Sequence, residues 1–301
     1  LIALERSVAL ARTWAHAAPL LAASFVLGSL LDIPGTPFAA LSSSAVLVLV
    51  NLALMRRQWA GFMAMMVLGS ISLLVGNLAW VLAGLPVFAV LPAWLSFFVL
   101  TIVAERLELS RLTPRPAWAA GLLWVFVVTT MVTSSLLLLE HRPGLVLLLG
   151  ASLAAIACWQ LVFDVARRTI VQHGLPRHAA LGVLLATAWL LVAGLVMVCF
   201  GFPAAGPHFD AAAHALLVGY VFSMVFAHAP IVLPVLLRVP LEFRARLYVP
   251  LAVLHGGLAL RVVGDLAAWP DLRLAGALAN VAALLVFGPT LLSCRRANPR
   301  R

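Results

Sequence analysis

The chain alternates between long uncharged apolar runs and short polar or Pro/Gly-containing connections. A helix needs about 20 mostly apolar residues to cross a hydrocarbon core roughly 30 Å thick, and each run is close to that length. Because the connections are short, we expect one transmembrane domain over residues 1–301. The fold class predicted is an all-α, polytopic transmembrane helical bundle. Its ten spans are predicted at residues 14–31, 38–55, 59–85, 87–104, 117–139, 145–163, 178–200, 211–237, 247–266 and 274–293.

The distribution of positive charge predicts the topology of these spans. With 64% hydrophobic and 10% charged residues, the composition excludes a soluble enzyme. All 20 basic residues are Arg, and seventeen of them fall in alternate connections and at the two ends. Arg142 and Arg273 fall in the other connections, and Arg261 falls inside a span. Cytoplasmic loops are enriched in Arg, so we predict cytoplasmic N- and C-termini in a bacterial-type inner membrane and no nucleic-acid partner.

Ionisable residues inside spans are functional candidates, because they are costly to bury in lipid. His214 lies near the outer end of span 211–237, and His228 follows fourteen residues later, which is close to four α-helical turns. This spacing predicts that both imidazoles share one face, about 21 Å apart along the axis. His255 lies near the middle of span 247–266, with Arg261 about two turns nearer the outer surface. His16 lies about one turn inside span 14–31, at a depth comparable to that of His228.

Histidines at these depths suggest a redox cofactor, because neutral imidazole is a ligand for haem iron and for copper. We expect His214 and His255 to be ligands in the outer half, and His16 and His228 to form an inner pair. Arg261 is then placed to bind a haem propionate, since guanidinium groups bind carboxylates with two hydrogen bonds. The cofactor predicted is haem b, with copper as a further candidate at His214, His255 and His228.

Structural roles are the alternative for each of these residues. A lone intramembrane His can hydrogen-bond across a helix interface, and Arg261 can pair with Asp265 four residues along the same helix. Four-residue spacing also predicts a hydrogen-bonded ladder of Gln160, Asp164 and Arg168 at the inner end of span 145–163. The asparagines that we expect to hydrogen-bond between helices are Asn51, Asn77 and Asn280.

Residues of the eighth and ninth spans resemble a known membrane family. The stretch His214-Ala215-Leu216-Leu217-Val218-Gly219, followed by Met224 and Ala227, resembles the His-Ala-Leu-x-x-Gly helix of NnrS-like proteins. The stretch from Leu258 to Asp265 resembles the helix that follows it in that family. The NnrS-like family is distantly similar to subunit I of haem-copper oxidases. Over about residues 210–266, the resemblance implies a haem-containing protein of nitric oxide or respiratory metabolism, with copper as a further candidate.

Three functions remain open on the sequence. The first is a haem-binding, electron-transfer subunit of a respiratory chain, working between quinol and a periplasmic electron carrier. The second is a ten-span transporter built from a five-plus-five inverted repeat, in which an odd number of spans per half inverts the second half. The third is a cofactor-free structural or quinone-binding subunit that assembles with other membrane subunits. The lipid bilayer is a partner in all three.

Overall fold

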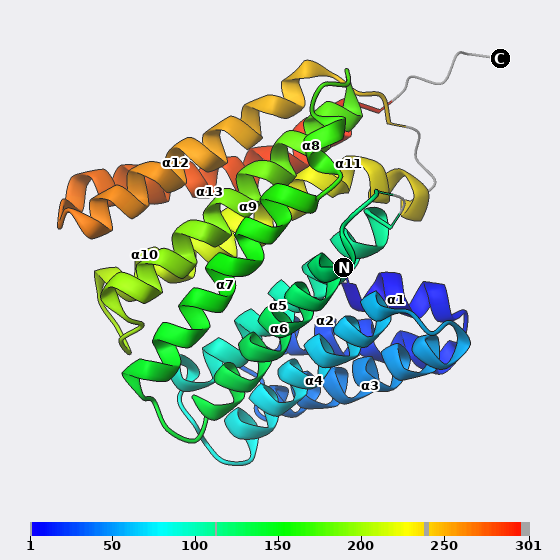
Figure 1. Ribbon diagram of the computed structural model, residues 1–301, viewed down its shortest axis with the longest axis vertical. Coiled ribbons are helices and arrows are strands. Elements are labelled where there is room, and N and C mark those ends of the chain that lie inside the picture. The colour runs from blue at the N-terminus through cyan, green and yellow to red at the C-terminus, as the bar shows by residue number, and fades with distance from the viewer. Residues whose placement is uncertain (1, 112, 238–240, 296–301) are drawn as a thin grey trace. The chain divides into compact units, whose positions relative to one another are not determined.

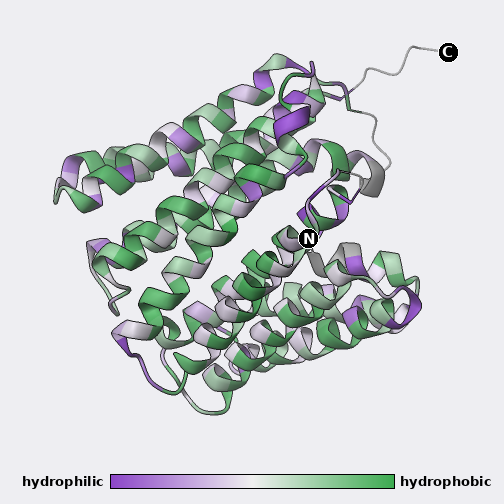
Figure 2. Cartoon of the chain, in the orientation of Figure 1, coloured by the Kyte–Doolittle hydropathy of each residue, from purple (hydrophilic) through white to green (hydrophobic). Residues whose placement is uncertain are grey.

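The computed structural model describes residues 2–111, 113–237 and 241–295, and these residues form helices and connections without a strand. Ten of the helical segments are long and apolar enough to cross a membrane, and each coincides with a predicted span. Hydrophilic residues gather at helix ends and connections, while the helix bodies are apolar (Figure 2). The prediction of an all-helical, multi-pass membrane protein is therefore confirmed. Orientation in the membrane stays a prediction.

The chain divides into two compact units, Leu1–Arg111 with Val127–Leu145 and Leu112–Phe126 with Val146–Arg301. The division passes through helix α6, Ala117–Leu136, and through the first turn of α7, Pro143–Phe163, so both helices contribute to both units. The first unit otherwise contains α1 (Ile2–Leu10), the 3-10 helix η1 (Thr13–His16), α2 (Ala17–Leu30), α3 (Thr36–Arg57), α4 (Gly61–Val81) and α5 (Val87–Leu109). The chain passes back and forth through α2, α3, α4 and α5, which are labelled in Figure 1.

The second unit contains the polar residues that carry the site. Its helices are α7 (Pro143–Phe163), α8 (Ala166–Thr169), α9 (Leu175–Phe200), α10 (Pro207–His214), the π-helix η2 (Ala215–Phe222), α11 (Ser223–Leu237), the 3-10 helix η3 (Ala245–Leu247), α12 (Tyr248–Leu266) and α13 (Pro270–Ser293). Helices α12 and α13 lie side by side as a hairpin (Figure 1).

Glycine and proline mark where several of these helices begin. Gly35, Gly174 and Gly206 have positive φ angles and stand immediately before α3, α9 and α10, each of which has a proline in its first two positions. Proline suits the start of a helix because the first N–H groups have no partner within the helix. Helix α13 also begins at a proline, Pro270, although the residue before it is Trp269 in an extended conformation. Arg273, predicted to lie in an outer loop, is therefore in the first turn of a helix.

The three predicted asparagines do hydrogen-bond between helices. In the first unit, Asn51 donates to the Met66 carbonyl at 3.4 Å and Asn77 donates to the Ala40 carbonyl at 3.1 Å. In the second unit, Asn280 of α13 donates to the Leu254 carbonyl of α12 at 2.8 Å. These bonds satisfy amide N–H groups that lipid could not.

The predicted ladder of Gln160, Asp164 and Arg168 is wrong because the helix ends too early. Helix α7 stops at Phe163, and Asp164 accepts a hydrogen bond from the Ala166 N–H at 2.7 Å. Gln160 accepts from the Tyr220 hydroxyl of η2 at 3.3 Å. An Asp that caps the following turn competes with continued helix, which is the physical reason for the break.

The eighth span is not one regular α-helix. Between His214 and Ser223 the backbone forms η2, a π-helix with hydrogen bonds from i to i+5. A π-helix has more residues per turn than an α-helix. The fourteen residues from His214 to His228 therefore do not make four α-helical turns. The basis for placing both imidazoles on one face is therefore removed. Such π segments occur frequently at functional sites.

Candidate functional site

Five ionisable residues meet at one end of the second unit, and we call Asp210, His214, Arg261, Asp265 and Arg273 the charged cluster. The Nη2 atom of Arg261 lies 3.4 Å from Asp210 Oδ2, and the Arg273 guanidinium binds the same carboxylate oxygen. Arg273 also places its Nε atom 2.9 Å from Asp265 Oδ1. The cluster thus links α10, α12 and α13 through two guanidinium groups and two carboxylates.

Close packing of α12 against α13 brings these residues together. A Cβ atom at Gly264 would lie 2.5 Å from the backbone nitrogen of Arg273, and one at Gly276 would lie 2.4 Å from that of Arg261. Only glycine permits helix backbones to approach this closely, as in other membrane helix pairs. The two glycines therefore set the register that places Arg273 beside Asp265.

Part of the hydrogen-bonding capacity of the charged cluster is unused. The side chain of Asp265 is 0% exposed, and those of Arg261 and Asp210 are 16% and 22% exposed. Neither carboxylate oxygen of Asp265 receives a well-directed hydrogen bond, because Arg273 Nε is close to Oδ1 but poorly aligned with it. The Nε–H of Arg261 has no acceptor. Buried polar groups are normally satisfied, so this spare capacity marks a place where a further group can bind.

His214 presents a free ring nitrogen near the charged cluster. Its Nδ1 atom lies 2.8 Å from the backbone carbonyl of Asp210. A carbonyl only accepts, so Nδ1 carries the proton and, in the neutral ring, Nε2 keeps its lone pair. This is the tautomer in which metal-ligating histidines are usually held. His214 therefore fits a role as a ligand of haem iron.

His255 lies in a chain of hydrogen bonds that uses both ring nitrogens. The indole N–H of Trp189 donates to Nδ1 at 2.9 Å, and Nε2 lies 3.1 Å from the Ser223 hydroxyl, which donates to the Gly182 carbonyl at 2.9 Å. An indole can only donate, so Nε2 carries the proton of the neutral ring and donates to Ser223. In this arrangement His255 has no lone pair for a metal and does not fit as a haem ligand.

The predicted inner pair falls in different units. His228 of α11 has Nδ1 2.8 Å from the Met224 carbonyl in the second unit. His16 has Nδ1 3.1 Å from the Ser7 hydroxyl in the first unit. Among the residues that the structure describes, no group of three or more His, Cys, Asp or Glu side chains is placed to hold a metal ion. A copper centre built from three such ligands is thus not formed by the described residues.

Sequence reasoning identified His214, His255 and Arg261 but missed their partners. Asp210 was an acidic residue in the first turn before an apolar run, and it lies four residues before His214. Arg273 was one of only two Arg in connections predicted to face outward. Its departure from the positive-inside pattern was the available signal. Trp189 and Ser223 carried no signal, because aromatic and hydroxyl side chains are common in spans.

Comparison with known proteins decides the family. A family model described as a domain of unknown function, DUF8744, matches residues 1–296. The chain belongs to the DUF8744 family. No curated protein and no solved structure matches this DUF8744 chain.

The NnrS-like resemblance of residues 210–266 is wrong, because the family that matches almost the whole chain is DUF8744 and no NnrS family matches. The stretch from His214 to Gly219 consists mainly of small and aliphatic residues that suit any membrane helix. In the DUF8744 chain, Gly219 has a packing role instead. A Cβ atom there would lie 2.4 Å from Trp189 Cβ, so the glycine makes room for the indole that donates to His255.

Proposed function

We propose that this DUF8744 protein is a membrane transporter that moves a small carboxylate anion together with a proton. The observation that carries the proposal is the position of Asp210, whose carboxylate is shared by Arg261 and Arg273 from two different helices. Ionisable residues in membrane-spanning segments commonly mark substrate and ion pathways. The ten spans are as compatible with a transporter as with a haem-binding subunit.

The two arginines define the substrate class. Arg binds carboxylates through paired, charge-assisted hydrogen bonds, so a substrate carboxylate competes directly with Asp210 for the same guanidinium groups. Arg273 is 45% exposed and Asp210 is 22% exposed, which leaves this carboxylate accessible to an arriving anion. The unpartnered Nε–H of Arg261 offers a further donor.

Charge balance requires a proton. The charged cluster contains two carboxylates and two guanidinium groups, so it is neutral when His214 is neutral. A bound anion adds one negative charge in a partly buried place, where an uncompensated charge is costly. Protonation of Asp210 or Asp265 compensates the charge of the anion and makes the charged cluster with its substrate neutral again. Asp265 is suited to accept the proton, because it is fully buried and its oxygens have no well-directed donor.

The membrane in the proposal is a bacterial-type inner membrane. The Arg distribution predicts that the connection between α12 and α13 faces the outer side of that membrane. The charged cluster lies next to this connection, since Asp265 is near the end of α12 and Arg273 near the start of α13. The substrate therefore enters the site from the outer, periplasmic side.

Uptake into proteoliposomes tests the proposal. Purified protein is reconstituted, an inward proton gradient is imposed, and accumulation of labelled lactate, succinate and glutamate is measured with and without a protonophore. We expect one of these carboxylates to accumulate only with the gradient, and we expect Asp265→Asn, which removes the proposed proton acceptor, to lose that accumulation. Asp271→Asn is the matched control, because Asp271 is an exposed carboxylate in the first turn of α13. Uptake that is equal in both variants contradicts the proposal.

Haem binding is a second candidate, favoured by the free Nε2 lone pair of His214 beside Arg261 and Arg273. His214 would hold the iron, the arginines would hold propionates, and the haem would supply electron transfer between quinol and a periplasmic carrier. The test is the Soret absorbance of protein purified after haem-replete expression. We expect His214→Ala to lose the band and the exposed-loop variant His141→Ala to keep it. A colourless wild-type protein excludes this candidate.

A further inference from the structure

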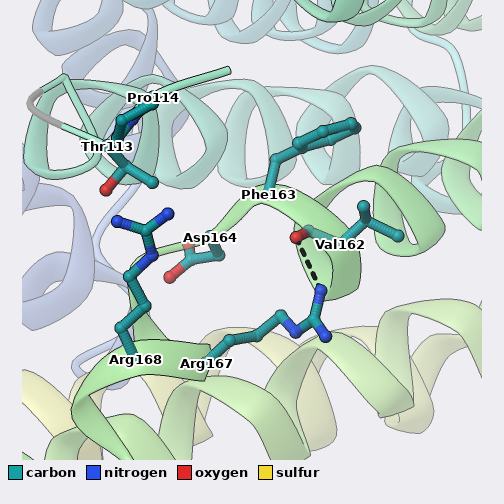
Figure 3. A pocket seen from close by; sticks show the side chains of 7 residues that line it. All are labelled: Thr113, Pro114, Val162, Phe163, Asp164, Arg167 and Arg168. Carbon is teal, nitrogen blue, oxygen red and sulfur yellow. Dashed lines mark hydrogen bonds between the residues drawn. The ribbon is translucent and has the colours of Figure 1, made fainter. Parts of the chain in front are cut away.

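A second polar feature of the same unit lies far along the chain from the charged cluster. A cavity of about 320 Å³ is formed where the chain enters α6 and where α7 ends. Its walls include Thr113, Val162, Phe163, Asp164, Arg167 and Arg168. Figure 3 shows the guanidinium group of Arg168 extending toward the Thr113 hydroxyl, with Asp164 beside it. We call this cavity the arginine pocket.

The arginine pocket carries excess positive charge. Among the residues that the structure describes, the guanidinium group of Arg168 has no hydrogen bond or ion pair. Arg167, by contrast, donates to the Val162 carbonyl at 2.9 Å (Figure 3). Asp164 is buried and accepts from the Ala166 N–H at 2.7 Å. Arg115, next to the pocket residue Pro114, adds a third guanidinium. The pocket and its border therefore hold three guanidinium groups and one carboxylate.

Arg115 gives independent evidence of an unfilled donor. Its guanidinium carbon lies 5.6 Å from the centre of the Trp159 ring, and its Nη1 atom is buried without a hydrogen-bond acceptor. Burial lowers the pKa of Arg115, and the nearby Asp164 carboxylate opposes that shift. A desolvated guanidinium with an unused N–H favours the approach of an anion to this region.

The surroundings of the arginine pocket are those of a membrane interface. Phe163 is the last residue of α7, and Ala117 is the first residue of α6, so the pocket lies at the ends of two spans. Trp118 is 61% exposed and packs edge-on against Phe163 at 5.8 Å between ring centroids. Val162 is 53% exposed. Exposed tryptophan and aliphatic side chains beside arginines are typical of the headgroup region, where basic pockets bind anionic lipids.

We infer that the arginine pocket binds the phosphate group of an anionic phospholipid. Arg168 supplies the main charged donor, and the Thr113 hydroxyl on the opposite wall supplies a neutral one. The acyl chains of the lipid lie along Val162 and Trp118, which are exposed beside the pocket. The excess positive charge selects a lipid with net negative charge over a zwitterionic one. This inference is independent of the transport proposal, because no residue of the charged cluster takes part.

Binding of short-chain lipids to the full-length, detergent-purified protein tests the inference. The probes are dioctanoyl phosphatidylglycerol, dioctanoyl phosphatidylcholine and inorganic phosphate, and affinity is measured by microscale thermophoresis. We expect phosphatidylglycerol to bind more tightly than the other two probes. We expect Arg168→Gln to weaken its binding about tenfold, since a hydrogen bond to a charged group is lost. Thr113→Val is expected to cause a smaller loss.

The matched control is Arg244→Gln, because Arg244 is also exposed, precedes a span and is predicted to face the cytoplasm, but does not line the pocket. This control is expected to retain phosphatidylglycerol binding. Equal losses in Arg168→Gln and Arg244→Gln would show only a general charge effect and would overturn the inference. Phosphatidylcholine binding as tight as that of phosphatidylglycerol would also overturn it. Inorganic phosphate binding as tight as that of the lipid would assign the pocket to free phosphate instead.

Discussion

Arg261 pairs with Asp210, which lies 51 residues earlier in the chain and on another helix, at 3.4 Å between Nη2 and Oδ2. Asp265, four residues along the helix of Arg261, is paired instead with Arg273 of the neighbouring helix. The two arginines therefore cross-link three helices. Local i, i+4 pairs stabilise one helix, whereas these pairs hold α10 and α13 to α12.

A double-mutant cycle tests whether the Arg261–Asp210 pair stabilises the fold. We expect Asp210→Asn and Arg261→Met each to lower the free energy of unfolding, because each leaves a partly buried charge with fewer partners. The double variant should lose less than the sum of the two losses. We expect a coupling energy of about 1–3 kcal/mol, measured by unfolding in mixed detergent micelles.

The Glu140–Arg142 pair is the control for that cycle. Its atoms approach to 2.5 Å, but the side chains are 59% and 67% exposed. Exposed pairs contribute about 0–1 kcal/mol because water screens them. A coupling energy for Arg261–Asp210 that is no larger than that of the control pair would contradict a stabilising role.

The charged residues show what the sequence could and could not predict. Spans were predictable because apolar length and Arg placement are local properties that a bilayer imposes on the chain. The partner of Arg261 was not, because two acidic residues were within reach and only the packing of α10, α12 and α13 selects between them. The way these three helices pack is not revealed by a single sequence.

The hydrogen-bond chain through His255 predicts a cost for losing Ser223. The Ser223 side chain is buried, and Ser223→Ala leaves the His255 Nε2–H without an acceptor and the Gly182 carbonyl without this donor. We expect a loss of about 1–3 kcal/mol in the free energy of unfolding. Ser24→Ala is the control, because Ser24 donates to a carbonyl of its own helix from an exposed position, and its loss should be small.

The same chain fixes the tautomer of His255. With Trp189 donating to Nδ1, the proton of the neutral ring must lie on Nε2. Nitrogen-15 NMR of labelled protein should therefore show His255 protonated at Nε2, whereas His214 should be protonated at Nδ1 because it faces a carbonyl. Finding the proton of His255 on Nδ1 would mean that the indole is not its partner.

Substitutions at two adjacent glycines of α12 test how closely α12 packs against α13, which is the packing that positions the charged cluster. A Cβ atom at Gly257 would lie 2.7 Å from Ala279 Cβ and 3.1 Å from the Asn280 backbone nitrogen, whereas one at Gly256 meets nothing within 4 Å. We expect Gly257→Ala to push α13 away and lower the thermal unfolding midpoint by several degrees. Gly256→Ala should leave the midpoint unchanged or raise it slightly, because alanine favours helix. Similar effects of the two substitutions would show that α12 and α13 do not pack as described.

The π-helix shows a second limit of sequence reasoning. Its residues Ala215–Phe222 have the same aliphatic character as the α-helices around them, so hydropathy predicted a span there but not its hydrogen-bond pattern. Its residues also make close tertiary contacts, among them the fit of Gly219 against Trp189 and Leu258, which the sequence of the span does not reveal. Predicting the face of His228 from that of His214 therefore required information outside the span.

Cysteine labelling tests the predicted topology and, with it, the direction from which the charged cluster is reached. Ala268 lies in the exposed turn between α12 and α13, and Gln172 lies in the exposed connection before α9. The three native cysteines, Cys158, Cys199 and Cys294, are first replaced by alanine. In intact cells, we expect Ala268→Cys to react with a membrane-impermeant maleimide because Arg placement puts this turn outside. Gln172→Cys should react only after the membrane is permeabilised. The reverse pattern would place the charged cluster on the cytoplasmic side and the arginine pocket on the outer side, where positive charge is normally depleted.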